Sequence, residues 1–210
     1  MTLHTSPRFP CVRRIAAVFT LVGFLSTATG CAAPSTRTDV LPPKTSSPHP
    51  AADVFAFADG EQLTAETEVQ WGDGFVADSG WKREPSDHPG RWSYTNARGT
   101  CTATFRDGVL GDAAGMDDRE ATDAVMEQRA GENWLGQEFV SDGTFLPYQR
   151  SERRVANRQF NFTVNGFGYF IAARAFVQAD AAVWVIVTCE GEPIGPVAEE
   201  VLSKNLLNVS

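Results

Sequence analysis

The sequence of 210 residues has few of the side chains that bind metals or act as catalysts. It contains three histidines and four cysteines, and the only histidines after residue 31 are His49 and His88. No C-x-x-C or H-E-x-x-H spacing occurs, which leaves a zinc site without partners. The G-x-S-x-G motif of serine hydrolases and a glycine-rich phosphate loop are absent too. We therefore expect no catalytic residue, no metal and no cofactor, and His88 is interpreted as a surface residue.

Positive charge is scarce as well. The chain has 18 basic and 26 acidic residues, which gives a net charge of -8. Residues 1–30 contribute three arginines and no acid, so the remainder carries 15 basic residues against 26 acidic ones, or -11. The phosphate backbone of nucleic acid repels such a surface, which argues against nucleic acid as a partner. A hydrophobic fraction of 42%, with 14 phenylalanines, is ample for one core.

No apolar run near the N-terminus is long enough to cross a membrane. The run at residues 15–25 is about half of the roughly 20 residues that a membrane span needs. Positive charge precedes it, and small residues at positions 28–30 follow it and lead to Cys31. A basic start, an apolar stretch and a small-residue end are the three parts of a secretory signal. The basic residues are Arg8, Arg13 and Arg14.

This arrangement resembles the signal of bacterial surface lipoproteins, as found in actinobacteria. Ala28 stands three residues before Cys31, where that family usually has leucine. The resemblance implies that residues 1–30 are a lipoprotein signal peptide and that Cys31 is the lipidation site. Acyl chains such as palmitate would then anchor the protein to the cell membrane on its extracytoplasmic face. An ordinary secretory signal and an uncleaved helix remain alternatives, and the export route, general or twin-arginine, stays open.

The segment that follows has the composition of a tether. Residues 31–52 contain five prolines together with many serines and threonines. Such a stretch cannot bury enough apolar surface to offset the entropy of ordering. We therefore expect a lipidated tether at 31–52 and a single globular domain at 53–210.

The remaining cysteines predict a disulfide. If Cys11 leaves with the signal and Cys31 is acylated, Cys101 and Cys189 form an even pair. Outside the cytoplasm such a pair most often oxidises. We therefore predict a Cys101–Cys189 bridge that closes a loop of nearly ninety residues.

Alternating polar and apolar residues predict two antiparallel hairpins. The first joins residues 91–96 to 100–106. The second turns at Asn165-Gly166, a type I′ signal, and would place Val164 opposite Phe167 and Phe162 opposite Tyr169. Residues 182–189 are apolar except at Thr188, which is typical of a strand covered on both faces.

Two helices are expected. In the first, Asp117 and Glu120 form a capping box and Gly131 ends the helix. Its buried stripe is expected at Ala121, Ala124, Val125 and Gln128, with Asp118, Arg119, Asp123 and Glu127 in solvent. The second helix is expected at residues 196–207, with a buried stripe formed by Val197, Ala198, Val201, Leu202 and Leu206.

These elements predict an α+β fold, an antiparallel β-sheet flanked by helices. Their order over residues 55–208 resembles the PsbP-like α/β/α sandwich, which occurs in extrinsic photosystem proteins and in small actinobacterial surface lipoproteins. The resemblance implies a binding or scaffold role and carries over no ligand site. The ligand-binding residues are thus unknown at this stage.

Three functional hypotheses follow. The first is a non-catalytic, membrane-anchored binding or scaffold module of the cell envelope, with an envelope protein or a small molecule as partner. The second is a glycan hydrolase with paired carboxylates, for which Glu132, Glu138 and Glu190 are considered. The third is a carrier of a small apolar ligand in a cavity lined by Phe160, Phe162 and Tyr169. A calcium site at Asp107, Asp112, Asp117 and Asp118 matches no EF-hand spacing, so a solvated loop and helix cap are preferred.

Overall fold

A computed structural model describes residues 54–86, 88–149 and 153–210. All of them belong to one compact unit, Ser47–Ser210. The predictions for the signal peptide, Cys31 and the tether fall outside the described residues. No helix in the described part is both long enough and apolar enough to cross a membrane.

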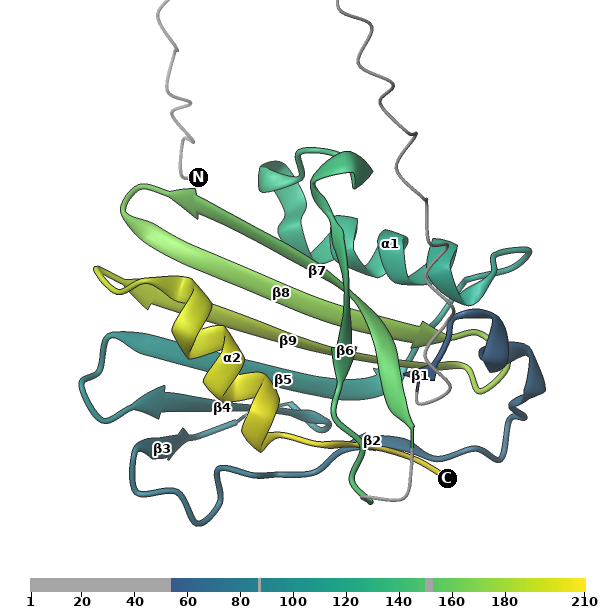
Figure 1. Ribbon diagram of the computed structural model, residues 1–210, viewed down its shortest axis with the longest axis horizontal. Coiled ribbons are helices and arrows are strands. Elements are labelled where there is room, and N and C mark those ends of the chain that lie inside the picture. Colours follow the sequence, from purple (N-terminus) through teal and green to yellow (C-terminus); the bar gives the residue numbers. More distant parts are fainter. Residues whose placement is uncertain (1–53, 87, 150–152) are drawn as a thin grey trace, which may run out of the picture. The chain divides into compact units, whose positions relative to one another are not determined.

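Most of the strands form one large, mostly antiparallel sheet, and two helices accompany it, which confirms the α+β class (Figure 1). The strand order is β1-β7-β8-β9-β5-β4-β3, and β6 also pairs with β7. A second, two-stranded sheet joins β10 to β2. The strands of the large sheet are β1 (Val54–Phe55), β3 (Trp81–Glu84), β4 (Arg91–Asn96), β5 (Cys101–Val109), β6 (Ser141–Phe145), β7 (Arg154–Val164), β8 (Phe167–Phe176) and β9 (Ala181–Glu190). Those of the small sheet are β2 (Val69–Trp71) and β10 (Leu207–Val209), and the 3-10 turns are η1 (Ala58–Gln62), η2 (Gly131–Asn133) and η3 (Gln137–Phe139).

The first strand pairs differently from the others. β1 runs parallel to β7, with Phe55 opposite Val155. β6 also pairs with Val155, so β1 and β6 must lie on opposite edges of β7. Since β6 and β8 likewise share partners on β7, β1 and β8 follow one another along the same edge. On this edge of β7 the pairing partner therefore changes from β8 to β1, and β8 separates from β7 at that point.

Both predicted hairpins are present. Tyr94 of β4 pairs with Ala103 of β5. In the second hairpin Asn165 and Gly166 both have positive φ, 51° and 83°, as a type I′ turn requires. The register is the predicted one, and the rings of Phe162 and Tyr169 stack at 4.9 Å. Local turn chemistry thus fixes the register of β7 and β8.

The helices are α1 (Asp118–Ala130) and α2 (Ile194–Lys204), and they cover opposite faces of the sheet. Met126 and Ala130 of α1 pack with Ile171 and Trp184. α2 instead packs on alternate residues of the same strands, among them Ala172 and Val185. Because successive strand residues point to opposite faces, the two helices lie on opposite sides. Figure 1 shows α2 in front of the sheet and α1 beside β7 and β8.

α1 starts and ends as predicted but turns a different face to the sheet. The capping box of Asp117 and Glu120 is formed, and Gly131 is the C-cap. The predicted stripe is correct for Ala121 and Val125 but wrong for Ala124 and Gln128, which are exposed. Asp118 and Asp123, expected in solvent, are buried instead. Each of these two acids forms an ion pair with a buried arginine of the sheet, which draws its side of the helix inward.

Two further expectations need correction. α2 begins at Ile194 and ends at Lys204, because the chain at Leu207 pairs with β2 instead of extending the helix. β9 is not covered along its whole length on both faces: Ile186 and Thr188 are half-buried. The reason is that α1 lies over β7 and β8, so it covers only the Trp184 end of β9.

Candidate functional site

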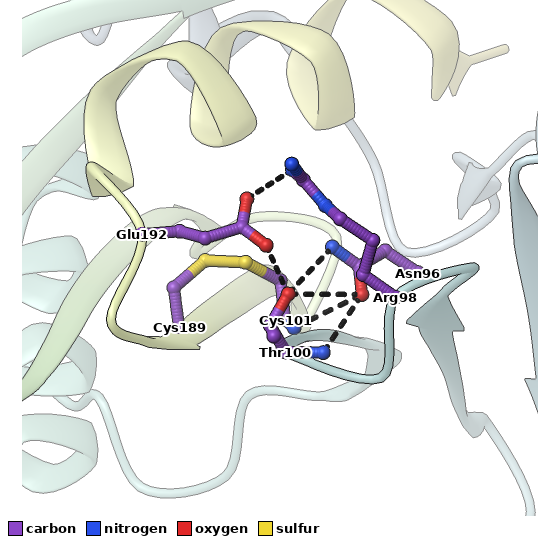
Figure 2. Close-up of a disulfide and its surroundings, with 6 residues drawn as sticks. All are labelled: Asn96, Arg98, Thr100, Cys101, Cys189 and Glu192. Atoms are coloured by element: carbon purple, nitrogen blue, oxygen red, sulfur yellow. Dashed lines mark hydrogen bonds and ion pairs between the residues drawn. A yellow bond between two sulfur atoms is a disulfide. The ribbon is translucent and has the colours of Figure 1, made fainter.

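The predicted disulfide is present and joins two central strands of the sheet near one end of each. Cys101 and Cys189 are bonded across 88 residues of sequence, and they are direct partners in the antiparallel pair of β5 and β9 (Figure 2). Both cysteines are almost fully buried. The bridge therefore fastens two strands that already pair.

Polar residues close the end of the sheet beside this bridge. The Asn96 side-chain oxygen accepts hydrogen bonds from the backbone N–H groups of Thr100 and Cys101, at 3.0 and 3.1 Å. Glu192 accepts hydrogen bonds from the Thr100 hydroxyl and the Arg98 guanidinium (Figure 2). These contacts hold the β4–β5 turn against the chain that leaves β9. We assign these contacts a structural role, because they link the turn to the chain around the disulfide.

An apolar cleft lies where β1 joins β7. It has a volume of about 350 Å³. Arg153 stands at its polar side, where Nη1 pairs with Asp59 at 2.9 Å and the guanidinium lies 5.1 Å from the Phe55 ring centroid. The lining residues are Phe55, Leu63, Thr67, Pro147, Arg153, Val155, Leu207, Val209 and Ser210. An apolar lining with a few polar groups is the usual composition of a small-molecule site.

A second groove, of about 530 Å³, lies on the other face of the same strands. It includes Ala56 and Ala156, whereas the apolar cleft includes their neighbours Phe55 and Val155. Successive strand residues alternate between faces, so the two hollows are back to back. Arg119 and Asp142 provide the charge of this second groove.

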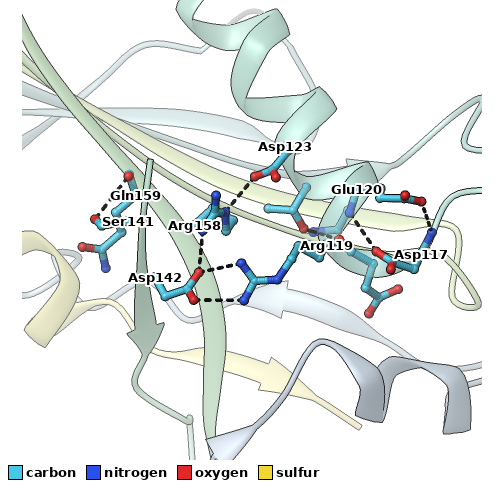
Figure 3. Close-up of polar contacts among 11 residues, drawn as sticks. Asp117, Arg119, Glu120, Asp123, Ser141, Asp142, Arg158 and Gln159 are labelled. Carbon is cyan, nitrogen blue, oxygen red and sulfur yellow. Dashed lines mark hydrogen bonds and ion pairs between the residues drawn. The ribbon is translucent and has the colours of Figure 1, made fainter. Parts of the chain in front are cut away.

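Arg119 and Asp142 belong to a network of four charged residues (Figure 3). Arg119 donates two hydrogen bonds to the Asp142 carboxylate, at 3.0 and 2.9 Å. Arg158 donates to Asp142 at 2.6 Å and to Asp123 at 2.7 Å. The hydrogen bonds from Arg119 are the main reason why the pKa of Asp142 is lowered. Burial by itself would lower the pKa of Arg158, but its two carboxylate partners raise it overall.

This network ties α1 to β6 and β7. Two acids balance two bases, and Arg158 and Asp123 are each only 9% exposed at the side chain. A charge-balanced pair of this kind holds elements in register and leaves no charge over for a ligand. We therefore assign the network a structural role.

A second buried ion pair lies where β8 separates from β7 and β1 takes its place. Arg174 of β8 is fully buried and donates to Asp118 at 2.8 Å and to the Ala56 carbonyl at 3.1 Å. Burial lowers the pKa of Arg174 to about 10 and raises the pKa of Asp118. The guanidinium also lies 4.1 Å from the Phe57 ring centroid. One side chain thus fastens the N-terminal segment to α1.

Neither Arg158 nor Arg174 was singled out from the sequence. The available signal was a single arginine inside an otherwise apolar strand, as in the segment from Phe167 to Phe176. A lone charge at such a position must find a buried partner, because an isolated buried charge is too costly.

The carboxylates considered for hydrolysis lie on three different elements. Glu132 lies on η2, Glu138 on η3 and Glu190 at the end of β9, and all three are exposed. His88 is exposed in the turn before β4. No group of three or more potential ligands in the described residues is placed to hold a metal ion.

The aspartates considered for calcium bind protein groups instead. Asp117 caps α1, and Asp118 pairs with Arg174. Asp107 accepts a hydrogen bond from the Trp71 backbone at 3.4 Å, and burial raises its pKa. Asp112 accepts one from the Ala114 backbone N–H. Their arrangement agrees with the preferred interpretation of a loop and a helix cap.

The aromatic residues considered for an apolar cavity form a packed layer. Phe160 is 1% exposed and packs with α1 and Trp134. Phe162 and Tyr169 are half-buried and stack on each other. The apolar cleft lies elsewhere, at β1, β7 and β10.

No family model matches this chain, and no curated protein matches it. The functional proposal therefore rests on the geometry of the described residues. It offers an apolar cleft with a polar side, a buried disulfide and a network in which two acids balance two bases.

Proposed function

We propose that this chain is a lipid-anchored, extracytoplasmic binding module of a bacterial cell envelope. The signal-like residues 1–30, the cysteine at position 31 and the proline-rich segment 31–52 support the anchor. The buried Cys101–Cys189 bridge supports the location, because such bridges persist in oxidising compartments.

We further propose that the fold belongs with the PsbP-like sandwiches. The support is the placement of α1 and α2 on opposite faces of one antiparallel sheet. A binding or scaffold role is what that fold implies.

The single observation that carries the binding role is the apolar cleft between β1, β7 and β10. Its volume of about 350 Å³ lies within the usual range for small-molecule pockets. Phe55, Val155 and Leu207 provide the apolar wall. The ligand it fits is a small apolar molecule with one polar group, which would face Arg153.

A neutral fluorescent probe, N-phenyl-1-naphthylamine, tests this role. The full chain would carry Cys31→Ala so that no acyl chain competes with the probe. Probe fluorescence should rise on binding, and Val209→Arg should weaken binding by at least about tenfold, since it puts a charge into the apolar wall. The matched control is Val109→Arg, at a side chain that is 75% exposed and outside the cleft. Equal binding by both variants would refute the assignment of the cleft.

The anchor has its own test. Cys31→Ala should move the protein from the detergent phase to the aqueous phase of a Triton X-114 partition, because the acyl chains are lost. An unchanged partition would contradict the anchor. It would leave the cleft proposal intact, since the two tests read different properties.

A further inference from the structure

Part of the sheet surface is left without a helix. On the side of α1, the helix lies over β7 and β8. The same side of β4, β5 and β9 carries half-buried residues, mostly with hydroxyl groups. Ser93 and Thr104 confirm that these strands share the face, because their hydroxyls hydrogen-bond at 2.9 Å. Register places the face at Ser93, Thr95, Thr102, Thr104, Ile186 and Thr188.

Two arginines meet at one end of this uncovered face. Arg106 of β5 is the direct partner of Trp184 on β9. The Arg129 guanidinium, from the last turn of α1, lies 5.3 Å from the Trp184 ring centroid. Burial lowers the pKa of Arg129, and the positive charge of Arg106 lowers it further. Both arginines thus lie beside Trp184, Arg106 as its strand partner and Arg129 over its ring.

Neither arginine forms an ion pair among the described residues, although burial raises the pKa of the neighbouring Asp107 carboxyl and the charge of Arg106 opposes that rise. None of the ion pairs found there includes Arg106 or Arg129. The Arg129 Nε atom is buried and donates no hydrogen bond, as is also true of two nitrogens of Arg174, while Arg129 Nη2 donates to the side-chain oxygen of Gln128. Six arginines elsewhere do pair with acids: Arg83, Arg98, Arg119, Arg153, Arg158 and Arg174.

This contrast is what needs an explanation. The chain has more acids than bases, 26 against 18, and its other buried charges are matched. Keeping two like charges together with an unsatisfied N–H costs free energy. An anion supplied from outside would balance the charge of the two guanidinium groups.

We propose that Arg106 and Arg129 form a phosphate-binding site beside Trp184. Guanidinium groups present paired N–H donors that match the oxygens of phosphate. A phosphate carries about -1.5 to -2 charges at neutral pH, which fits two guanidinium groups better than one carboxylate does. The ligand is inorganic phosphate or a small phosphate ester. This site is distinct from the apolar cleft and does not depend on it.

The test follows the arginine Nε–H signals of the full chain by NMR during titration with inorganic phosphate. Ionic strength is held constant with chloride, because salt screens diffuse attraction. The Arg106 and Arg129 signals should shift in a saturable way. Arg106→Gln and Arg129→Gln should each weaken phosphate binding by at least about tenfold, since each removes a charge-assisted contact.

The matched control is Arg83→Gln, which removes the same charge from a paired arginine on β3. It should change phosphate affinity by less than about twofold. Arg106→Lys keeps the positive charge but lacks the paired N–H donors of a guanidinium group, so its phosphate affinity should lie between those of the wild type and Arg106→Gln. This comparison tests the site even if Arg129→Gln fails to fold. Absence of a saturable shift, or equal weakening by the control, would overturn the proposal.

A second titration with glycerol 3-phosphate distinguishes the source of the phosphate. Binding at least as tight as that of inorganic phosphate would assign the site to phosphate esters. Binding of inorganic phosphate alone would assign it to the free ion.

Discussion

Arg174 is the residue on which the N-terminal edge of the sheet depends. Its guanidinium holds the Asp118 carboxylate and the backbone carbonyls of Ala56 and Phe57. Asp118 in turn accepts a hydrogen bond from the Val177 N–H at 2.8 Å. Gly60 packs directly on this pair, since a Cβ there would lie 1.8 Å from a carboxylate oxygen of Asp118. One buried arginine therefore connects β8, α1, β1 and η1.

Replacing this arginine should destabilise the domain strongly. Arg174→Met leaves Asp118 as a buried charge without a partner, which costs about 3–5 kcal/mol of unfolding free energy. Urea denaturation measures the loss. Arg119→Met, which breaks an ion pair with an exposed Asp142, is the control and should cost under about 1 kcal/mol. A loss for Arg174→Met as small as that of the control would contradict the role given to Arg174.

Tyr94 should titrate at unusually high pH. Burial, followed by its hydrogen bond to Asp73, raises the Tyr94 pKa to about 12. Because the folded pKa is raised, this contribution to stability is complete below pH 10 and is lost as pH rises through about 12. Ultraviolet absorbance of tyrosinate should show a phenol titrating near pH 12, and Tyr94→Phe should remove it. Persistence of that step in Tyr94→Phe would show that another tyrosine is responsible.

Among the elements, those with local signals were predicted best. The Asn165-Gly166 turn and the Asp117 capping box require particular residues at particular positions, so the sequence alone locates them. The inward face of α1 was predicted wrongly, because charge was assumed to mean solvent. Asp118 and Asp123 face inward only because Arg174 and Arg158 lie on other elements. Partners distant in sequence cannot be found from helical spacing.

The capping box gives an element-scale prediction. Asp117→Ala removes the acceptor of the Glu120 backbone N–H, a hydrogen bond of 2.8 Å. It should cost about 1 kcal/mol of stability, the usual value of an N-cap. Urea denaturation should show this loss, whereas Asp112→Ala, an exposed loop aspartate, should stay within about 0.5 kcal/mol of wild type. Equal effects of the two changes would mean that the cap contributes nothing specific.

At the scale of the whole molecule, class and disulfide were predictable and the clefts were not. Counting cysteines and assuming export was enough to pair Cys101 with Cys189. The apolar cleft, in contrast, combines Phe55, Val155 and Leu207, which come from three distant parts of the chain. The Arg106–Arg129 site likewise joins a strand and a helix. Such sites arise from topology, which sequence patterns specify only coarsely.

The disulfide should stabilise the domain as a whole. It closes a span of 88 residues, for which the chain-entropy estimate is about 4 kcal/mol. The double variant Cys101→Ala/Cys189→Ala should lose about this much in urea denaturation. Treating the wild type with a reductant should lower its stability, while the double variant should not respond. A double variant as stable as the oxidised wild type would contradict the estimate.

The change of pairing partner from β8 to β1 also has a mechanical consequence. Any tension on the chain upstream of Val54 reaches the domain through a strand of two residues, which is held by its pairing with β7 and, just after it, by the hydrogen bonds from Arg174 to the carbonyls of Ala56 and Phe57. These contacts set the force at which the N-terminal strand detaches from the domain. In single-molecule stretching, the Arg174→Met variant should therefore unfold at a lower force than the wild type.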